Sequence, residues 1–130
     1  LLNLKIICRD KTWKHINYIG DIIGEGWETL ARKHNLKITT SNFKPLVSMK
    51  FNYGKFNQLL ITYFTQEMLR RGYLASNSVY VSSAHTQKIV KKYLKNVDKV
   101  FEKMSQNIIK KSINKSLKTR VRQEGFKRLN

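Results

Sequence analysis

Residues 36–72, LKITTSNFKPLVSMKFNYGKFNQLLITYFTQEMLRRG, decide the fold, because the spacing of their apolar side chains changes partway along. Apolar and polar side chains alternate in residues 36–40 and again in residues 47–51, as they do in a half-buried strand. From residue 56 the apolar side chains recur at steps of three and four, which predicts a helix that ends at Gly72. Two strands followed by a helix are therefore expected in the middle of the chain.

On the N-terminal side of this stretch, residues 12–34 predict another helix. Thr12 can cap its start, and Asn35 tolerates the left-handed backbone that ends many helices. Glycines inside it, Gly24 and Gly26 among them, each cost up to about 1 kcal/mol relative to alanine, so we expect another backbone to pack closely there. The apolar side chains expected on the buried face are Trp13, Ile16, Ile19, Ile23, Trp27 and Leu30.

Beyond Gly72 the chain is expected to extend in residues 73–75, to turn in residues 76–78 and to form a third short strand in residues 79–83. Thr86 can then cap a third helix. The apolar side chains on the expected buried face of that helix are Ile89, Val90, Tyr93, Leu94, Val97, Val100, Phe101 and Met104. The predicted fold class is α+β, a small, mostly antiparallel sheet of three to four short strands packed with three main helices.

The charge of the chain is strongly positive, with 26 lysines and arginines against 8 acidic residues. From Lys88 onward there are fourteen basic and three acidic residues, so the excess lies mainly in the last segment. Such a charge raises nucleic acid as a partner, and a basic α+β nucleic-acid-binding module without catalysis is the alternative function. However, lysines dominate and few aromatic side chains lie between them, whereas specific base recognition relies on arginine and aromatic side chains. We therefore expect a solvated, lysine-rich helix face and no specific nucleic acid partner.

The composition also argues against several kinds of site. Cys8 is the only cysteine, so the chain cannot form an internal disulfide or a zinc cluster built on thiolates. His15 and His34 have no acidic or cysteine partner at ligand spacing, so we expect surface histidines and no metal site. No apolar run approaches the roughly 20 residues that cross a bilayer, so we expect no membrane partner. The single cysteine favours a reducing, cytoplasmic setting.

Several stretches in order resemble one enzyme family. Residues 66–75, QEMLRRGYLA, and residues 81–86, VSSAHT, resemble the helix-to-strand and strand-to-helix passages of class III (fold-type I) pyridoxal-phosphate-dependent aminotransferases. The closest branch is the one that includes glutamate-1-semialdehyde 2,1-aminomutase. The ending GFKRLN, residues 125–130, looks like the tail of some bacterial members, and the main resemblance covers about residues 12–104.

The resemblance implies a domain organisation and a set of partners. Residues 1–110 would be the C-terminal small domain of the enzyme, and residues 111–130 a basic, weakly ordered tail. The first residue is not methionine, which fits an excised fragment. In the family, pyridoxal phosphate is held by a lysine of a large domain, so we expect the fragment alone to hold no cofactor and to be inactive. The implied partners are that large domain, a second subunit in a homodimer, a small-molecule amino donor and an aldehyde or keto acceptor.

The resemblance carries over only a few site candidates and no catalytic residue. Ser76, Asn77 and Tyr80 lie in the turn that faces the substrate pocket in the family. Counting back from His85, the position of a glutamate that acts near the substrate amine in the aminomutase holds Asn77. An amide cannot ionise, so the resemblance implies an ordinary two-substrate aminotransferase at least as readily as an aminomutase. As a surface-turn residue, Asn77 should tolerate replacement by alanine within about 0.5 kcal/mol of stability.

Three polar residues are expected to act structurally. A histidine beside a cap residue most often orients a turn by hydrogen bonds, so His85 and Thr86 are interpreted as a turn and a helix cap rather than as a general base or ligand. Glu67 lies between core positions of the central helix, where a structural hydrogen bond is expected instead of acid–base chemistry.

Overall fold

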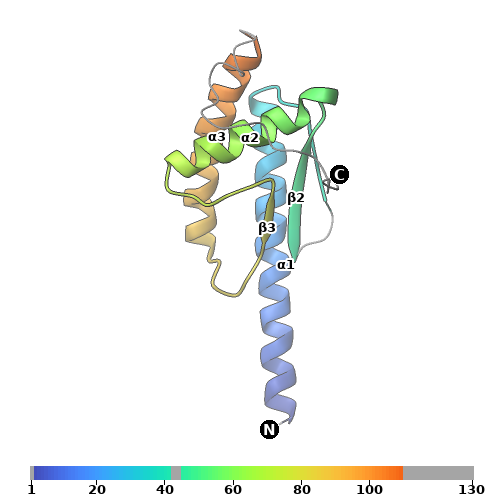
Figure 1. Cartoon of the computed structure of the whole chain (residues 1–130). Coiled ribbons are helices and arrows are strands. Elements are labelled where there is room, and N and C mark those ends of the chain that lie inside the picture. Colours follow the sequence, from blue (N-terminus) through green and yellow to red (C-terminus); the bar gives the residue numbers. More distant parts are fainter. Residues whose placement is uncertain (1, 42–44, 110–130) are drawn as a thin grey trace, which may run out of the picture.

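The computed structural model of the chain describes residues 2–41 and 45–109, with side chains from residue 11 onward. Its three α-helices and its antiparallel sheet of three strands confirm the predicted α+β class (Figure 1). In chain order the elements are α1 (Leu2–Lys33), β1 (Ile38–Thr40), β2 (Leu46–Phe51), the short 3-10 helix η1 (Gly54–Phe56), α2 (Asn57–Arg70), β3 (Ser78–Tyr80) and α3 (Gln87–Ile109).

β2 is the central strand of the sheet, and it pairs with β1 on one side and β3 on the other. Val47, Met49 and Phe51 alternate along it and are almost fully buried, which confirms the face predicted from the period of two. Val79 of β3 lies opposite Val47 across the ladder, so the apolar face continues onto the third strand.

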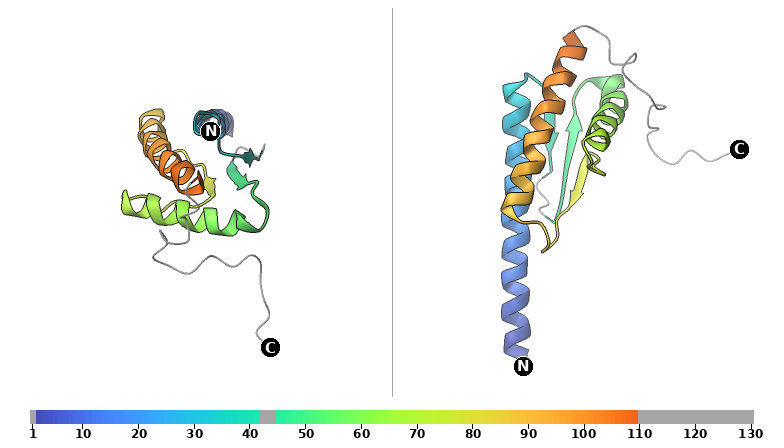
Figure 2. Two further views of the ribbon diagram at one scale, coloured as in Figure 1. Left: turned by 90° about the horizontal axis from the view of Figure 1, so that it is seen from above. Right: turned by 90° about the vertical axis from the view of Figure 1, so that its left-hand side faces the viewer.

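The core lies between the helices and one face of the sheet. Figure 2 shows α1 and α3 side by side, with α2 running across the other side of the core. Phe101 of α3 has its ring centroid 6.4 Å from that of Phe51 in β2 and 5.9 Å from that of Phe64 in α2. Aromatic pairs of this kind contribute about 0.5–1.5 kcal/mol beyond their buried area. One side chain of α3 therefore joins three elements.

α1 and α3 approach each other closely at Gly26. A Cβ atom at this position would lie 2.6 Å from Cδ1 of Leu94 in α3. The prediction that another backbone packs against the helix glycines is therefore wrong here, because the nearest atoms belong to the Leu94 side chain. At Gly24 a Cβ atom would make an ordinary contact of 3.6 Å with Cγ1 of Val47.

The two ends of α1 differ in how well the sequence predicted them. α1 begins at Leu2 and not at Thr12, because residues 2–11 contain neither glycine nor proline to end a helix. The N-terminal half of α1 projects beyond the sheet and α3 (Figure 1), and Trp13 in this half is 54% exposed instead of buried. At the other end Asn35 has a φ of +56°, which confirms the predicted left-handed residue.

β3 is shorter than predicted. It covers Ser78–Tyr80 instead of residues 79–83, and residues 73–75 form no strand. After β3, the backbone N–H of Val81 donates to the carbonyl oxygen of Pro45. Pro45 lies just before the first residue of β2, so β3 has no strand left to pair with from Val81 onward.

The structure confirms the predicted end of α2 but corrects the predicted burial of one residue at the start of α3. α2 ends just before Gly72, whose φ of +86° favours glycine, as predicted. Ile89 was expected on the buried face of α3, but it is half-exposed, because it lies in the first turn beside an open cavity. The predicted tail of residues 111–130 lies outside the described residues.

Candidate functional site

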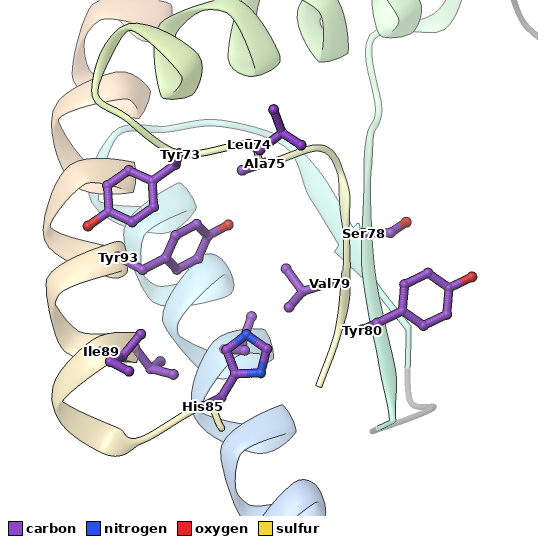
Figure 3. A pocket seen from close by; sticks show the side chains of 11 residues that line it. Tyr73, Leu74, Ala75, Ser78, Val79, Tyr80, His85, Ile89 and Tyr93 are labelled. Atoms are coloured by element: carbon purple, nitrogen blue, oxygen red, sulfur yellow. The ribbon is translucent and has the colours of Figure 1, made fainter. Parts of the chain in front are cut away.

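A mostly apolar cavity lies between α1, the segment that includes β3, and the start of α3 (Figure 3). We call it the apolar pocket, and its volume is about 360 Å³, near the lower end of the range for ligand sites. It is lined by Ile23, Tyr73, Leu74, Ala75, Ser78, Val79, Tyr80, His85, Ile89, Val90 and Tyr93. α1 and the segment from Tyr73 to Tyr93, which are distant in the sequence, thus form one concave surface.

Tyr93 supplies the apolar pocket with a buried hydroxyl group. The indole N–H of Trp27 donates to its oxygen at 3.2 Å. Burial raises the pKa of the Tyr93 hydroxyl far above its ordinary value of 10.0, although the hydrogen bond from Trp27 opposes this rise. The hydroxyl therefore stays protonated at any physiological pH, and it can donate a hydrogen bond. The helical periodicity predicted Tyr93 only as part of an apolar stripe, although buried tyrosine hydroxyls usually have a partner.

His85 stands at one end of the apolar pocket and organises the turn before α3. Its Nδ1 accepts a hydrogen bond from the backbone N–H of Ser82 at 2.9 Å. Its carbonyl oxygen lies 2.7 Å from Nε2 of His15, which joins the turn to α1. Thr86 caps α3, because its Oγ1 accepts from the backbone N–H of Ile89 at 3.2 Å. In this geometry His85 and Thr86 hold the backbone in place.

Ser76, Asn77 and Tyr80 do not converge on one cavity. The Asn77 Nδ2 donates to the carbonyl oxygen of Met49 at 3.1 Å, and the Met49 N–H donates to the Asn77 carbonyl oxygen at 2.8 Å. Ser76 Oγ donates to Asn77 Oδ1 at 3.1 Å. Figure 3 shows the exposed ring of Tyr80 on the opposite side of β3 from Val79, pointing away from Tyr93. Asn77 is thus tied to β2, whereas Tyr80 forms part of the pocket rim.

A second cavity, the polar groove, lies between β1, β2 and the start of α2, with a volume of about 600 Å³. Asn77 is one of its lining residues, together with Thr39, Ser48, Asn57 and Gln58. Oε1 of Gln58 is buried and accepts no hydrogen bond from the described part of the chain. These hydroxyl and amide groups can form hydrogen bonds with a polar group, and Lys50, which also lines the groove, adds a positive charge.

His34 is a mostly buried hydrogen-bond partner of Asp98 and not the surface histidine that the sequence predicted. Its mostly buried Nε2 lies 2.6 Å from Oδ1 of Asp98 in α3, and Nζ of Lys33 lies 3.0 Å from the other carboxylate oxygen. The hydrogen bond with His34 lowers the pKa of the Asp98 carboxyl; desolvation partly opposes this, and Lys33 lowers it further. The partners are 64 residues apart in sequence, so no local spacing could have revealed the pair.

Glu67 is a buried carboxylate in α2 with two cationic neighbours. Its Oε1 lies 2.9 Å from Nη1 of Arg70, and its Oε2 lies 3.6 Å from Nζ of Lys103 in α3. A buried carboxylate requires such compensation, since an unpaired charge in the interior is strongly unfavourable. Glu67 therefore joins α2 to α3 and lies outside both cavities.

The described ranges, 2–41 and 45–109, contain neither a metal-binding group nor a membrane-spanning helix. Histidine, cysteine, aspartate and glutamate side chains form no group of three or more there that could hold a metal ion. The helices in these ranges also lack a stretch long and apolar enough to cross a membrane.

Comparison with known proteins finds relatives by sequence and by structure, although no family model matches the chain. The chain is 23% identical over 108 residues to glutamate-1-semialdehyde 2,1-aminomutase 1 of Staphylococcus carnosus (strain TM300), which covers 73% of this chain and 25% of that protein. Its fold matches the PLP (pyridoxal phosphate) internal aldimine form of the FumI protein of Sphingopyxis sp. MTA144, with a TM-score of 0.68 and 18% identity over 82% of this chain and 26% of that chain. The chain spans about a quarter of the length of each relative. In sequence and in fold, the chain therefore resembles a segment of a pyridoxal-phosphate enzyme of the aminomutase and aminotransferase kind.

Proposed function

We propose that this chain is the C-terminal small domain of a class III pyridoxal-phosphate-dependent aminotransferase related to glutamate-1-semialdehyde aminomutase. In this role it closes one side of the substrate pocket of a transamination site. The observation that carries the proposal is the agreement of two relatives. The sequence relative is a glutamate-1-semialdehyde aminomutase, and the structural relative is a pyridoxal-phosphate protein. Each is matched over about a quarter of its length.

The residues that the structure describes do not fit a site for the cofactor itself. Every lysine whose side chain the structure describes is exposed. No lysine lines the apolar pocket, and Lys50 at the polar groove is an exposed residue of β2. A lysine that binds a cofactor covalently has to be desolvated or activated by its surroundings. We therefore assign the cofactor lysine to a large domain outside this chain.

The segment 76–80 is the part of the chain that we assign to the substrate pocket. Asn77 is hydrogen-bonded to β2 and Ser76 is hydrogen-bonded to Asn77, so their polar groups have defined positions. Tyr80 is largely exposed at the end of β3, where another domain can cover it. These residues would shape the pocket and orient a small-molecule amino donor and an aldehyde or keto acceptor by hydrogen bonds.

We assign the parent enzyme to two-substrate aminotransferases and not to aminomutases. The reason is Asn77, an amide that cannot carry charge or a mobile proton near an amine. The parent should show higher turnover with an amino donor plus an acceptor than with glutamate-1-semialdehyde in steady-state assays. High aminomutase turnover with Asn77 in place would contradict this assignment.

The parent is further proposed to be a cytoplasmic homodimer. Support for the compartment comes from the single cysteine, Cys8, which leaves the chain without an internal disulfide. Analytical ultracentrifugation of the parent gives its subunit number directly.

The central test restores the coding sequence upstream of Leu1 and compares the parent protein with the 130-residue chain. After addition of pyridoxal phosphate, the parent should show the absorption band of a lysine-bound cofactor, and the isolated chain should show none. A stoichiometric band in the isolated chain, tied to one lysine, would overturn the domain assignment. A parent that binds no cofactor would overturn the proposed function.

A further inference from the structure

The polar groove includes the face of the sheet that turns away from the core. Every second residue of β2 is buried on the core side, so Ser48 and Lys50 between them point to the other side. Thr39 of β1 lies opposite Lys50 across the ladder and shares its face. Figure 1 shows the start of α2 beside the end of β2, and Asn57 and Gln58 of this turn line the same groove. A volume of about 600 Å³ is within the usual size range of ligand sites.

Gln58 brings an unsatisfied hydrogen-bond acceptor to this groove. Its Oε1 is buried, yet it accepts no hydrogen bond within the described residues. Buried polar atoms in folded proteins almost always have a partner, because an unpaired one has lost its bond to water and gained nothing in return. A group from outside the chain that donates to this oxygen would remove that cost.

The neighbouring side chains supply hydrogen-bond donors with defined positions. Oδ1 of Asn57 accepts from the backbone N–H of Tyr53 at 2.7 Å, which orients the amide and leaves its Nδ2 to donate. Oγ1 of Thr39 accepts from Nδ2 of Asn52 at 2.7 Å, so its own hydroxyl proton remains for another acceptor. A ligand with several hydroxyl groups can therefore donate to Gln58 and accept from Asn57 and Thr39.

The charges around the groove favour an anion and disfavour a cation. Among the described residues that line it, Lys50 is the only charged one, and none is a carboxylate. The first turn of α2 contains no acidic residue, and its N-cap residue, Phe56, makes no side-chain cap. The positive end of the helix dipole therefore adds to the charge of Lys50. An ammonium group in this groove would lack a counter-ion.

We propose that the polar groove binds a small polyhydroxylated carboxylate of the sugar-acid class. The ligand carboxylate pairs with Lys50 beside the start of α2, and the ligand hydroxyl groups bond to Gln58, Asn57 and Thr39. A single lysine balances one negative charge, so a carboxylate suits the groove better than a phosphate group, which carries almost two. This inference goes beyond the proposed function, because the contacts come from β1, β2 and α2 and not from the segment 76–80.

Two-dimensional proton–nitrogen NMR of the 130-residue chain tests the ligand class, with gluconate as the probe. Sorbitol carries the hydroxyl groups without the carboxylate, hexanoate carries the carboxylate without the hydroxyl groups, and glucosamine carries a positive charge instead. We expect gluconate to shift the side-chain amide signals of Asn57 and Gln58 until they saturate. It should bind at least about fivefold more tightly than each of the other three compounds, since each lacks one set of the proposed hydrogen bonds or the charge.

Two substitutions test the location of the site. Gln58→Leu removes the buried acceptor and Lys50→Gln removes the charge, and Gln87→Leu and Lys95→Gln make the same changes at exposed positions of α3. We expect each groove variant to weaken gluconate binding at least about fivefold and the two controls to leave it unchanged. Gln58→Leu should not lower the urea midpoint of the unliganded chain, because the lost oxygen has no partner within the described residues.

The outcomes against the inference are separate for each part of it. Sorbitol or glucosamine binding as tightly as gluconate would overturn the anionic ligand, and hexanoate binding as tightly would overturn the hydroxylated one. If gluconate leaves the signals of Asn57 and Gln58 unchanged, the groove holds only water and the inference is overturned, while the proposed function stands. Equal weakening in the groove variants and in the α3 controls would place the binding elsewhere and also overturn it.

Discussion

Asn77 contributes to the fold through both its main chain and its side chain. Its backbone carbonyl oxygen accepts from the Met49 N–H, and its side-chain amide donates to the Met49 carbonyl oxygen. The hydrogen bonding between β2 and β3 therefore begins one residue before β3. The sequence predicted a surface turn residue with little effect on stability. The structure instead makes it a link between two strands.

Asn77→Ala should therefore lower the free energy of unfolding by about 0.5–1.5 kcal/mol, the usual worth of one intramolecular hydrogen bond. Urea unfolding of the 130-residue chain measures this loss. Ser83→Ala, at an exposed position nearby, is the control and should stay within about 0.5 kcal/mol of the original chain. A loss no larger than that of the control would mean that the bond to Met49 contributes nothing measurable.

Asp98 gives a pH dependence whose sign follows from its ion pair. Its pKa is lower in the folded chain than the ordinary value of 3.8, so its stabilising effect is fully present above that value. The effect is lost as the pH falls through the folded pKa, because the protonated carboxyl no longer pairs with His34 and Lys33.

Asp98→Asn should accordingly destabilise the chain at pH 7, and the difference from the original chain should shrink below pH 3.8. The measurement is the urea midpoint of both proteins across an acid pH series. Glu102→Gln, at an exposed position one turn along α3, should cause no comparable change. A difference that is constant down to the lowest pH would contradict the ion-pair account.

At the scale of elements, two glycines of α1 differ in how closely other parts of the chain pack against them. Gly26 faces the Leu94 side chain, whereas Gly24 has space for a methyl group beside Val47. The two glycines lie in one helix and are close in sequence, so their helix propensities are the same and only the packing differs.

Gly24→Ala should stabilise the chain by up to about 1 kcal/mol through helix propensity. Gly26→Ala should gain the same propensity but lose more through overpacking, which typically costs about 1–3 kcal/mol. Thermal and urea unfolding of both variants separate these effects. Adding Leu94→Ala should remove the penalty specific to Gly26→Ala, and a strictly additive double variant would refute the steric explanation.

At the scale of the whole molecule, the charge and the fold point to different partners. The lysine side chains of α3 stand apart in water on one face, without aromatic side chains interleaved among them. Such a surface attracts phosphate groups through charge alone and does not recognise bases.

Any binding to nucleic acid should therefore be weak, indifferent to sequence and strongly reduced by salt. Fluorescence anisotropy with two unrelated duplexes of equal length, measured from low to physiological salt, gives both the affinity and its salt dependence. Equal weak binding to both duplexes is the expected result. Tight and selective binding at physiological salt would instead support the alternative function as a nucleic-acid-binding module.

The sequence by itself determined the elements that depend on neighbouring residues. The alternation of Val47, Met49 and Phe51 identified a strand and its buried face, because side chains on a strand alternate between its two faces. Asn35 and Gly72 marked the ends of two helices, because these residue types adopt the left-handed backbone at little cost. The resemblance in the 66–75 and 81–86 stretches also pointed to the kind of enzyme that both comparisons support.

Only the tertiary structure decided which distant residues meet. His34 and Asp98 pair across 64 residues, and Gly26 faces a leucine of α3, because packing and not local spacing brings α1 and α3 together. It also placed Tyr93 at the back of the apolar pocket and left Trp13 exposed on the stripe that the sequence predicted to be buried. Periodicity reports the face of an element but not the length over which another element covers it, and that length depends on how the whole chain packs.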